Sequence, residues 1–239
     1  FGAIPLWITP QLDLSPISAI FESISGLTTT GATVITGLDA LPRSLLLYRQ
    51  LLQWLGGIGI IVLAVAILPM LGIGGMQLYR AESAGPSKDR KLTPRITSTA
   101  KALFGIYLLL TVACALSYFA AGMSPFNALC HAFSTVAIGG FSTHDASLGH
   151  YEENAILLVS SLFMLFSAIN FGLHFVALQR RTARVYARDS ETAFFITVIA
   201  LATVVTCSLL LTTETLGVED SLIHGVFQTI SIATTTGFT

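Results

Sequence analysis

The chain has 239 residues, of which 53% are hydrophobic and only 10% are charged. A soluble domain carries about 25% charged residues, so this composition excludes an ordinary water-soluble fold and requires lipid as part of the solvent. The formal net charge of -1 offers no basic surface for nucleic acid, and three scattered cysteines exclude a disulfide framework or a zinc cluster.

Four stretches are long and apolar enough to cross a bilayer, because a crossing helix needs about 20 mostly apolar residues. In chain order they are Leu51–Met76, Ala102–Ala121, Ala155–Leu178 and Ala193–Leu211. Three further apolar stretches are too short to cross, and they lie near residues 17–27, 126–137 and 222–233. We expect these short stretches to enter and leave the membrane on one side.

Basic residues gather in two segments, and the positive-inside rule places both on the cytoplasmic side. Ten of the twelve Lys and Arg residues lie there: Arg80, Lys88, Arg90, Lys91, Arg95 and Lys101 in one, and Arg180, Arg181, Arg184 and Arg188 in the other. Two crossing stretches separate these segments, so all three short stretches face the outer side. The acidic residues of the outer loops either attract cations or are simply solvated.

The short stretches form an internal repeat anchored on three glycines, Gly31, Gly140 and Gly237, which are 109 and 97 residues apart. A serine stands sixteen residues before each glycine, and another stands six residues before it: Ser15, Ser124 and Ser221, then Ser25, Ser134 and Ser231. Proline follows the first serine in two copies, whereas Leu222 follows it in the third. Three copies of one pattern are not explained by unrelated turns.

The repeat predicts a half-length helix that ends inside the membrane. Serine followed by proline begins a helix, since the hydroxyl caps a free N–H and proline fits the first turn. A helix of about 10–12 residues spans roughly 15–18 Å, which is half of a 30 Å hydrocarbon core. Its C-terminal end carries partial negative charge, so a cation resting there is stabilised.

An irregular glycine segment follows each half-length helix, at Thr28–Thr33, Ala137–Ser142 and Thr234–Thr239. Irregular backbone at membrane depth survives only where it lines a cavity or is buried in protein. Glycine permits backbone angles that turn carbonyl groups toward an ion, as in potassium filters. The predicted potassium ligands are backbone carbonyls of Thr29, Thr30, Gly31, Ile138, Gly139, Gly140, Thr235, Thr236 and Gly237.

Polar residues inside the short helices have two interpretations. Glu22 and His131 occupy equivalent positions, nine residues before the glycine, and either act electrostatically on an ion or anchor the helix behind the filter. Anchoring is favoured for both. Gly56, Gly57 and Gly59 open the first crossing stretch, where small residues favour close helix contact over a functional role.

At these residues the chain resembles the Trk/Ktr/HKT superfamily of potassium transporters, and within it the bacterial Trk-type membrane subunits. The resemblance is carried by Thr28–Thr33, the Ile138–Ser142 string, Thr234–Thr239, the Gln53–Gly59 string, the run Ala81–Pro86 and the string Lys91–Arg95. It implies an all-α membrane protein with four repeats, each a helix, pore helix, filter and helix, around one central pore. We expect this chain to be an internal portion of such a protein without its fourth filter.

The resemblance also divides the chain into predicted units. Residues 1–76 end the first repeat, 77–101 form a basic linker, 102–178 form the second repeat, 179–192 form another linker, and 193–239 form the third repeat as far as its filter. It implies K+ as the transported ion, a homodimer, the bacterial inner membrane, and a cytosolic nucleotide-binding regulatory subunit of the TrkA type. This chain carries no nucleotide-binding motif of its own, and no organic cofactor is expected.

Two other functions remain open at this stage. A secondary cation transporter would use similar broken helices near the membrane midplane, although its repeats are often inverted. An intramembrane enzyme is disfavoured, because no zinc motif, paired catalytic carboxylates or nucleophile elbow is present.

Overall fold

The computed structural model describes residues 1–62, 92–213 and 217–239, which form helices and loops without strands. The helices in chain order are α1 (Ile4–Trp7), α2 (Pro16–Leu27), α3 (Arg43–Val62), α5 (Leu92–Ala120), α6 (Pro125–Val136), α7 (Asn154–Ala168), α8 (Phe171–Arg180), α9 (Arg184–Arg188), α10 (Ser190–Thr212) and α11 (Val218–Ala233). Two short 3-10 helices, η1 (Leu38–Ala40) and η5 (Ser147–His150), lie in loops. The predicted all-α fold is confirmed.

Two predicted crossings appear as long apolar helices. The second stretch falls within α5, whose apolar part is Ala100–Ala120, and the fourth falls within α10. Of the first stretch, α3 includes residues 51–62, and the rest lies outside the described residues, as do four of the basic residues in the first linker.

The prediction of one continuous helix over Ala155–Leu178 is wrong. The segment forms α7 and α8, which meet at 91°. Asn170 causes the new start, because its side chain accepts a hydrogen bond from the Gly172 N–H at 2.9 Å and so caps α8. His174 holds the corner through the Phe166 carbonyl at 2.9 Å and the Tyr186 hydroxyl at 2.8 Å. Hydropathy alone does not reveal a change of helix direction.

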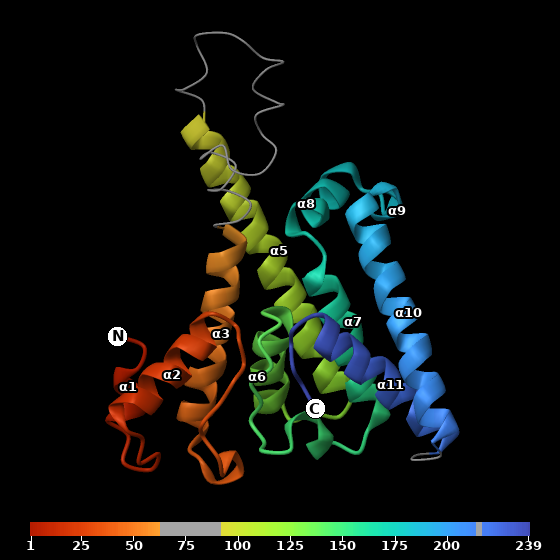
Figure 1. The fold of residues 1–239 in the computed structure, drawn as a ribbon. Coiled ribbons are helices and arrows are strands. Elements are labelled where there is room, and N and C mark those ends of the chain that lie inside the picture. The colour runs from red at the N-terminus through yellow and green to blue at the C-terminus, as the bar shows by residue number, and fades with distance from the viewer. Residues whose placement is uncertain (63–91, 214–216) are drawn as a thin grey trace.

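The three short helices α2, α6 and α11 lie in the same half of the molecule, opposite α8 and α9 (Figure 1). Helix α3 contacts both α2 and α6, and α7 contacts both α6 and α11. We call the three glycine segments filters after their predicted role. Each of α3 and α7 follows a filter and therefore supports the short helix before it and the next one. This arrangement places the three glycine segments in succession around one region.

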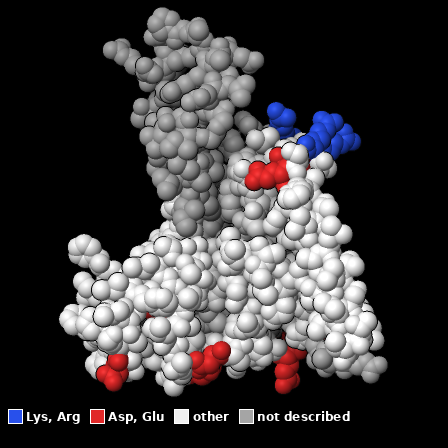
Figure 2. All heavy atoms as spheres, in the orientation of Figure 1, with Lys and Arg blue, Asp and Glu red and all other residues white. Residues whose placement is uncertain are grey.

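Burial and charge follow the expected membrane orientation. The main core lies between α5, α6, α7 and α11, with Tyr107, Tyr118, Phe227 and Phe238 fully enclosed. Helix α10 is apolar all round and largely exposed, as a lipid-facing helix must be. Lys and Arg gather at the end that carries α8 and α9, whereas most acidic side chains mark the other end (Figure 2).

Candidate functional site: three glycine filters

The first two short helices begin as the sequence predicts. Ser15 accepts a hydrogen bond from the Ser18 N–H at 3.1 Å, and Ser124 accepts one from the Asn127 N–H at 3.3 Å. In both helices proline occupies the first turn. Since the two helices have 12 residues each, they cover only part of the membrane.

The third short helix begins earlier than predicted. Ser221 is buried within α11, which starts at Val218 after Gly217 and has 16 residues. Leu222 stands where the other copies have proline, so no residue forces the helix to begin there. Glu219 and Asp220 suit the first turn, because the helix N-terminus carries partial positive charge.

Two residues after the end of each short helix stands a residue with left-handed backbone angles. These residues are Thr29, Ile138 and Thr235, with φ values of 55°, 48° and 64°. In the first copy the Thr29 N–H donates to the Gly26 carbonyl and the Thr30 N–H donates to the Ser25 carbonyl, which is the Schellman pattern of helix ends. The second copy repeats both bonds. Left-handed angles are costly for β-branched residues, and such strain is concentrated at functional sites.

The three anchor glycines also share one conformation, with φ values of 77°, 79° and 78° at Gly31, Gly140 and Gly237. A Cβ atom at Gly31 would collide with the Gly139 carbonyl oxygen, and one at Gly140 would collide with the Thr236 carbonyl oxygen. The three filters therefore lie side by side, each against the next. A Cβ at Gly237 would meet no atom of the described residues within 4 Å.

A serine one turn inside each helix secures the filter behind it. The Ser25 hydroxyl donates to the Ala32 carbonyl at 2.6 Å, and the Ser231 hydroxyl donates to the Phe238 carbonyl at 2.7 Å. Ser134, the third member of the set, instead donates to the Gln53 side chain at 2.8 Å. The serine pattern in the sequence thus marks the support of the filter backbone.

The first filter is held by a buried ion pair. Arg49 on α3 donates from Nε and Nη2 to Glu22 Oε1 at 2.9 and 2.7 Å, and both side chains are at most 1% exposed. Glu22 also accepts hydrogen bonds from the Thr33 hydroxyl and the Val34 N–H, just after the first filter. The anchoring interpretation of Glu22 therefore matches its contacts.

Arg49 also reaches the second filter. Its guanidinium lies 4.3 Å from the centre of the Phe141 ring, and Nη1 donates to the Ser142 carbonyl at 3.4 Å. Sequence reasoning singled out Glu22 but did not identify Arg49 as its partner. Because a buried carboxylate must be paired with an opposite charge, Glu22 in an apolar helix could have indicated a nearby Arg or Lys partner.

The second filter is held by neutral groups. Gln53, one turn after Arg49, accepts hydrogen bonds from Ser134 and the Phe141 N–H through Oε1, while its Nε2 donates to the Gly139 carbonyl at 2.6 Å. Gly139 makes room for this side chain, since a Cβ there would lie 2.7 Å from Gln53 Oε1. The predicted ion ligand Gly139 thus has a protein partner that the sequence analysis did not predict.

His131 completes the support of the second filter. Its Nδ1 donates to the Asn127 carbonyl at 2.9 Å, so Nε2 accepts from the Ser142 hydroxyl, also at 2.9 Å. The ring is fully buried. These contacts match the anchoring role predicted for His131.

Close helix contact explains two of the glycines on α3. A Cβ at Gly56 would collide with the Leu27 carbonyl at the end of α2, and one at Gly57 would lie 3.2 Å from Ala137 Cα at the end of α6. Both glycines let α3 approach the helix ends next to the filters. Gly59 meets no such neighbour among the described residues.

Long apolar helices combined with short helices that end on successive glycine segments define an all-α membrane protein. A profile of the TrkH family, described as a cation transport protein, matches residues 2–239, so the chain belongs to that family. Together with the apolar helices, this membership makes it an integral protein of the bacterial inner membrane.

Named relatives agree with the family. The chain is 59% identical over its full length to the Trk system potassium uptake protein TrkH of Halomonas elongata and 55% identical to that of Vibrio parahaemolyticus, spanning 49% and 50% of those proteins. The crystal structure of the potassium transporter TrkH from Vibrio parahaemolyticus matches with a TM-score of 0.89 at 51% identity, over 100% of this chain and 48% of that one. The chain thus spans about half the length of these relatives.

Proposed function

We propose that this chain supplies three of the four filters of a potassium uptake pore. The observation that supports this most strongly is the direct contact of successive filters, each at the C-terminal end of a half-length helix. Relatives over the whole chain are named potassium uptake proteins. The chain is a transport protein and not an enzyme.

Backbone groups supply the attraction for the cation. Arg49 offsets Glu22, the buried acid nearest the first filter, so little net charge remains behind that filter. The C-terminal ends of α2, α6 and α11 contribute partial negative charge toward the filters, and carbonyl groups replace the hydration shell of the ion. A dehydrated ion held by dipoles can leave again, which conduction requires.

The ion ligands we propose are the nine backbone carbonyls of the three filters, from the residue two before each glycine to the glycine itself. The Gly139 carbonyl, which Gln53 also contacts, retains a second lone pair for this role. Each filter has a single anchor glycine. We therefore expect fewer good ion sites, and weaker rejection of sodium, than in filters with two glycines.

A fourth filter closes the ring at Gly237. A carbonyl group of the next filter packs against Gly31 and against Gly140. The corresponding side of Gly237 meets no atom of the described residues within 4 Å. In each observed contact the carbonyl belongs to the residue just before the glycine of the next filter. We therefore expect the Thr30 carbonyl to pack against the glycine of the fourth filter. We place these missing groups in the remaining half of the complete subunit, which assembles as a homodimer.

The pore is tested by potassium flux and by reversal potentials with potassium on one side and sodium on the other, using the complete subunit in liposomes. Gly140→Val should abolish flux or selectivity, because valine resists a φ of 79° and its Cβ would collide with the Thr236 carbonyl. Gly105→Val is the control, since a Cβ at Gly105 on α5 meets no atom of the described residues within 4 Å. An unchanged permeability ratio in Gly140→Val would refute the filter assignment.

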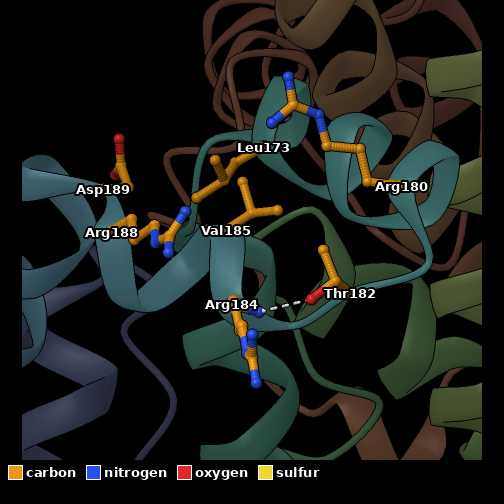
Figure 3. A pocket seen from close by; sticks show the side chains of 7 residues that line it. All are labelled: Leu173, Arg180, Thr182, Arg184, Val185, Arg188 and Asp189. Atoms are coloured by element: carbon orange, nitrogen blue, oxygen red, sulfur yellow. Dashed lines mark hydrogen bonds between the residues drawn. The ribbon is translucent and has the colours of Figure 1, made fainter.

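A cytosolic regulatory subunit of the TrkA type gates the pore by docking on the basic end of the chain. Figure 3 shows Arg180, Arg184 and Arg188 around a pocket of about 410 Å³ between α8 and α9. Exposed arginines at the cytoplasmic end suit an acidic partner surface, and they equally suit anionic lipid headgroups. Since this chain has no nucleotide-binding motif, nucleotide control requires the partner.

Charge reversal separates these two roles. Glutamate at Arg180, Arg181 and Arg184 should weaken binding of the regulator and reduce its salt dependence, while Arg43→Glu at the opposite end should not. Equal binding by all variants across a salt series would remove these arginines from the interface and leave the pore assignment intact.

Ion symport through the same filters is the alternative function. The bend of 91° between α7 and α8 favours it, because broken helices are common in secondary transporters. Proton coupling would shift the reversal potential with pH at constant potassium concentrations. A reversal potential that depends on potassium alone supports the channel.

A further inference from the structure

Three side chains with metal-binding atoms meet outside the filters. Asp39 follows the first filter, and His144 and His150 follow the second; their ligand atoms all lie within 4.8 Å of one another. The two imidazole rings are parallel, with centres 3.6 Å apart and planes 2° from parallel. The carboxylate of Asp39 contacts His144 Nδ1 directly.

Buried leucines fix the two short helices that carry the outer members of this cluster. Leu38 begins η1 and leaves Asp39 exposed beside it, while Leu148 lies fully buried in η5 and positions His150 at its end. Asp145 joins the two loops by accepting a hydrogen bond from the Gly37 N–H at 3.0 Å. The three side chains are therefore held together by their backbones and do not depend on a bound ligand for their approach.

The electrostatics of the cluster favour a cation between the three groups. The two imidazole rings stack with centres 3.6 Å apart beside the Asp39 carboxylate, so their nitrogens and its oxygens lie close together. The hydrogen bond from His144 lowers the pKa of Asp39, and the carboxylate is therefore charged at neutral pH. The exposed edges of Asp39 and His150 leave a path for an ion from the outer solution.

We propose that Asp39, His144 and His150 form a binding site for a transition-metal dication such as Zn²⁺. Two imidazole nitrogens and one carboxylate oxygen are typical zinc ligands at about 2.0–2.2 Å, with water completing a tetrahedron. Tetrahedral ligands at that radius lie about 3.3 Å apart, and a metal lies in the plane of each imidazole that binds it. The exposed His150 ring must therefore rotate out of its stack on His144 to share the ion. This ligand set disfavours Mg²⁺ and Ca²⁺, which prefer oxygen ligands.

Asn127 prepares His144 for this role. Its amide nitrogen lies 3.0 Å from His144 Nε2, and Nδ1 of the same ring faces Asp39. When the metal takes the place of the proton at Nδ1, the proton moves to Nε2, and rotation of the Asn127 amide presents its oxygen as the acceptor. A hydrogen bond behind a metal-binding histidine fixes the ring in this way.

The site joins the loops that follow the first and second filters, and it lies next to the end of the third. The turn that carries His150 also contacts the third filter, because the Gly149 N–H donates to the Thr239 carbonyl at 2.9 Å and Ser147 accepts from the Thr239 N–H at 3.2 Å. A bound metal would therefore link the loop after the first filter to the loop after the second, and this second loop already contacts the end of the third filter. We expect the metal to stabilise the folded subunit by an amount that grows with the logarithm of the Zn²⁺ concentration above its Kd.

Zinc titration of the purified complete subunit tests the proposal by calorimetry and thermal unfolding. The wild type should bind one Zn²⁺ that is absent from Asp39→Asn/His150→Gln, and each single variant should bind at least about tenfold more weakly. His150→Gln is the key variant, since no hydrogen bond holds this exposed side chain within the described residues. His224→Gln on α11 is the matched control and should retain wild-type affinity.

Three results would overturn the site. They are the absence of zinc binding by the wild type up to millimolar concentration, equal zinc affinity in the wild type and the double variant, and displacement of Zn²⁺ by an equal concentration of Ca²⁺ or Mg²⁺. A melting temperature that rises with Zn²⁺ in the wild type and in His224→Gln, but not in His150→Gln, supports it. None of these measurements depends on potassium flux.

Discussion

The first and second filters share a backbone but are held by different chemistry. Behind the first filter lies the buried ion pair of Glu22 and Arg49; behind the second lie the neutral side chains of Gln53 and His131. Both Arg49 and Gln53 come from one face of α3, four residues apart. The same backbone turn can thus be secured by charge or by amide hydrogen bonds, provided that every buried polar group has a partner.

The difference extends to the filter sequences. In the first filter the Thr28 and Thr30 hydroxyls bond to each other at 2.8 Å, and Thr234 and Thr236 do the same in the third. The second filter has Ala137 and Gly139 at these positions, and the Gln53 amide occupies the space beside Gly139. In the second filter, the Gln53 side chain of α3 therefore supplies the support that hydrogen bonds between two threonines supply in the first and third filters.

The largest effect should come from Arg49→Met. This change leaves the Glu22 carboxylate buried without a counter-charge, and we expect a loss of about 3–5 kcal/mol in the free energy of unfolding of the complete subunit. Thermal or denaturant unfolding in detergent measures it. Arg43→Met, at an exposed residue of the same helix, should change stability by no more than about 0.5 kcal/mol.

A double variant sharpens this test. Glu22→Gln/Arg49→Met removes both charges, so it should be less destabilised than Arg49→Met alone. If the double variant loses as much stability as the sum of the two single variants, the ion pair is not what holds the first filter.

Gln53→Leu should have a smaller effect, confined to the second filter. It leaves the Ser134 hydroxyl, the Phe141 N–H and the Gly139 carbonyl without their partner, and each unsatisfied buried group costs about 1–3 kcal/mol before relaxation. We expect a net loss of about 3 kcal/mol together with reduced potassium-to-sodium selectivity. Gln179→Leu, at an exposed position, is the control, and an equal loss in both variants would contradict the assigned role.

Gly139→Thr tests why the second filter departs from the threonine pattern. The new side chain would collide with Gln53, and overpacking of this kind costs about 1–3 kcal/mol. We expect Gly139→Thr to reduce potassium-to-sodium selectivity as well. Adding Gln53→Ala makes room for the threonine, so the double variant should recover part of this selectivity. Unfolding and reversal-potential measurements on both variants decide the matter; the explanation fails if Gly139→Thr alone behaves as the wild type.

The smallest effect should come from the helix caps. Ser15→Ala and Ser124→Ala each remove an exposed capping bond to a backbone N–H, which costs about 1 kcal/mol, and Ser15→Ala also removes the exposed 2.9 Å bond to the Ser18 hydroxyl. Because both caps satisfy one backbone N–H and the additional bond is exposed, the losses should agree within about 0.5 kcal/mol even though the filters behind them are held differently. A much larger loss in one variant would show that the difference between the filters reaches the start of the helix.

Much of the fold was accessible from residue patterns. The serine and proline starts of α2 and α6, the glycine positions, the apolar part of α5 and the extent of α10 depend on local chemistry and hydropathy, which the sequence displays directly. Local signals were misleading at two places. An unbroken apolar run concealed the corner that Asn170 makes between α7 and α8, and the repeat register placed the start of α11 four residues late.

By itself the sequence determined that the chain is a membrane protein with three equivalent half-length helices, each followed by a glycine turn, because those features depend on residue type and spacing. Only the tertiary structure decided which side chains support which filter. Arg49 meets Glu22 across 27 residues, and Gln53 meets Gly139 across 86. Such pairs form because α3 lies between two short helices, and the demand of buried polar groups for partners is met by whichever donors that arrangement brings within reach.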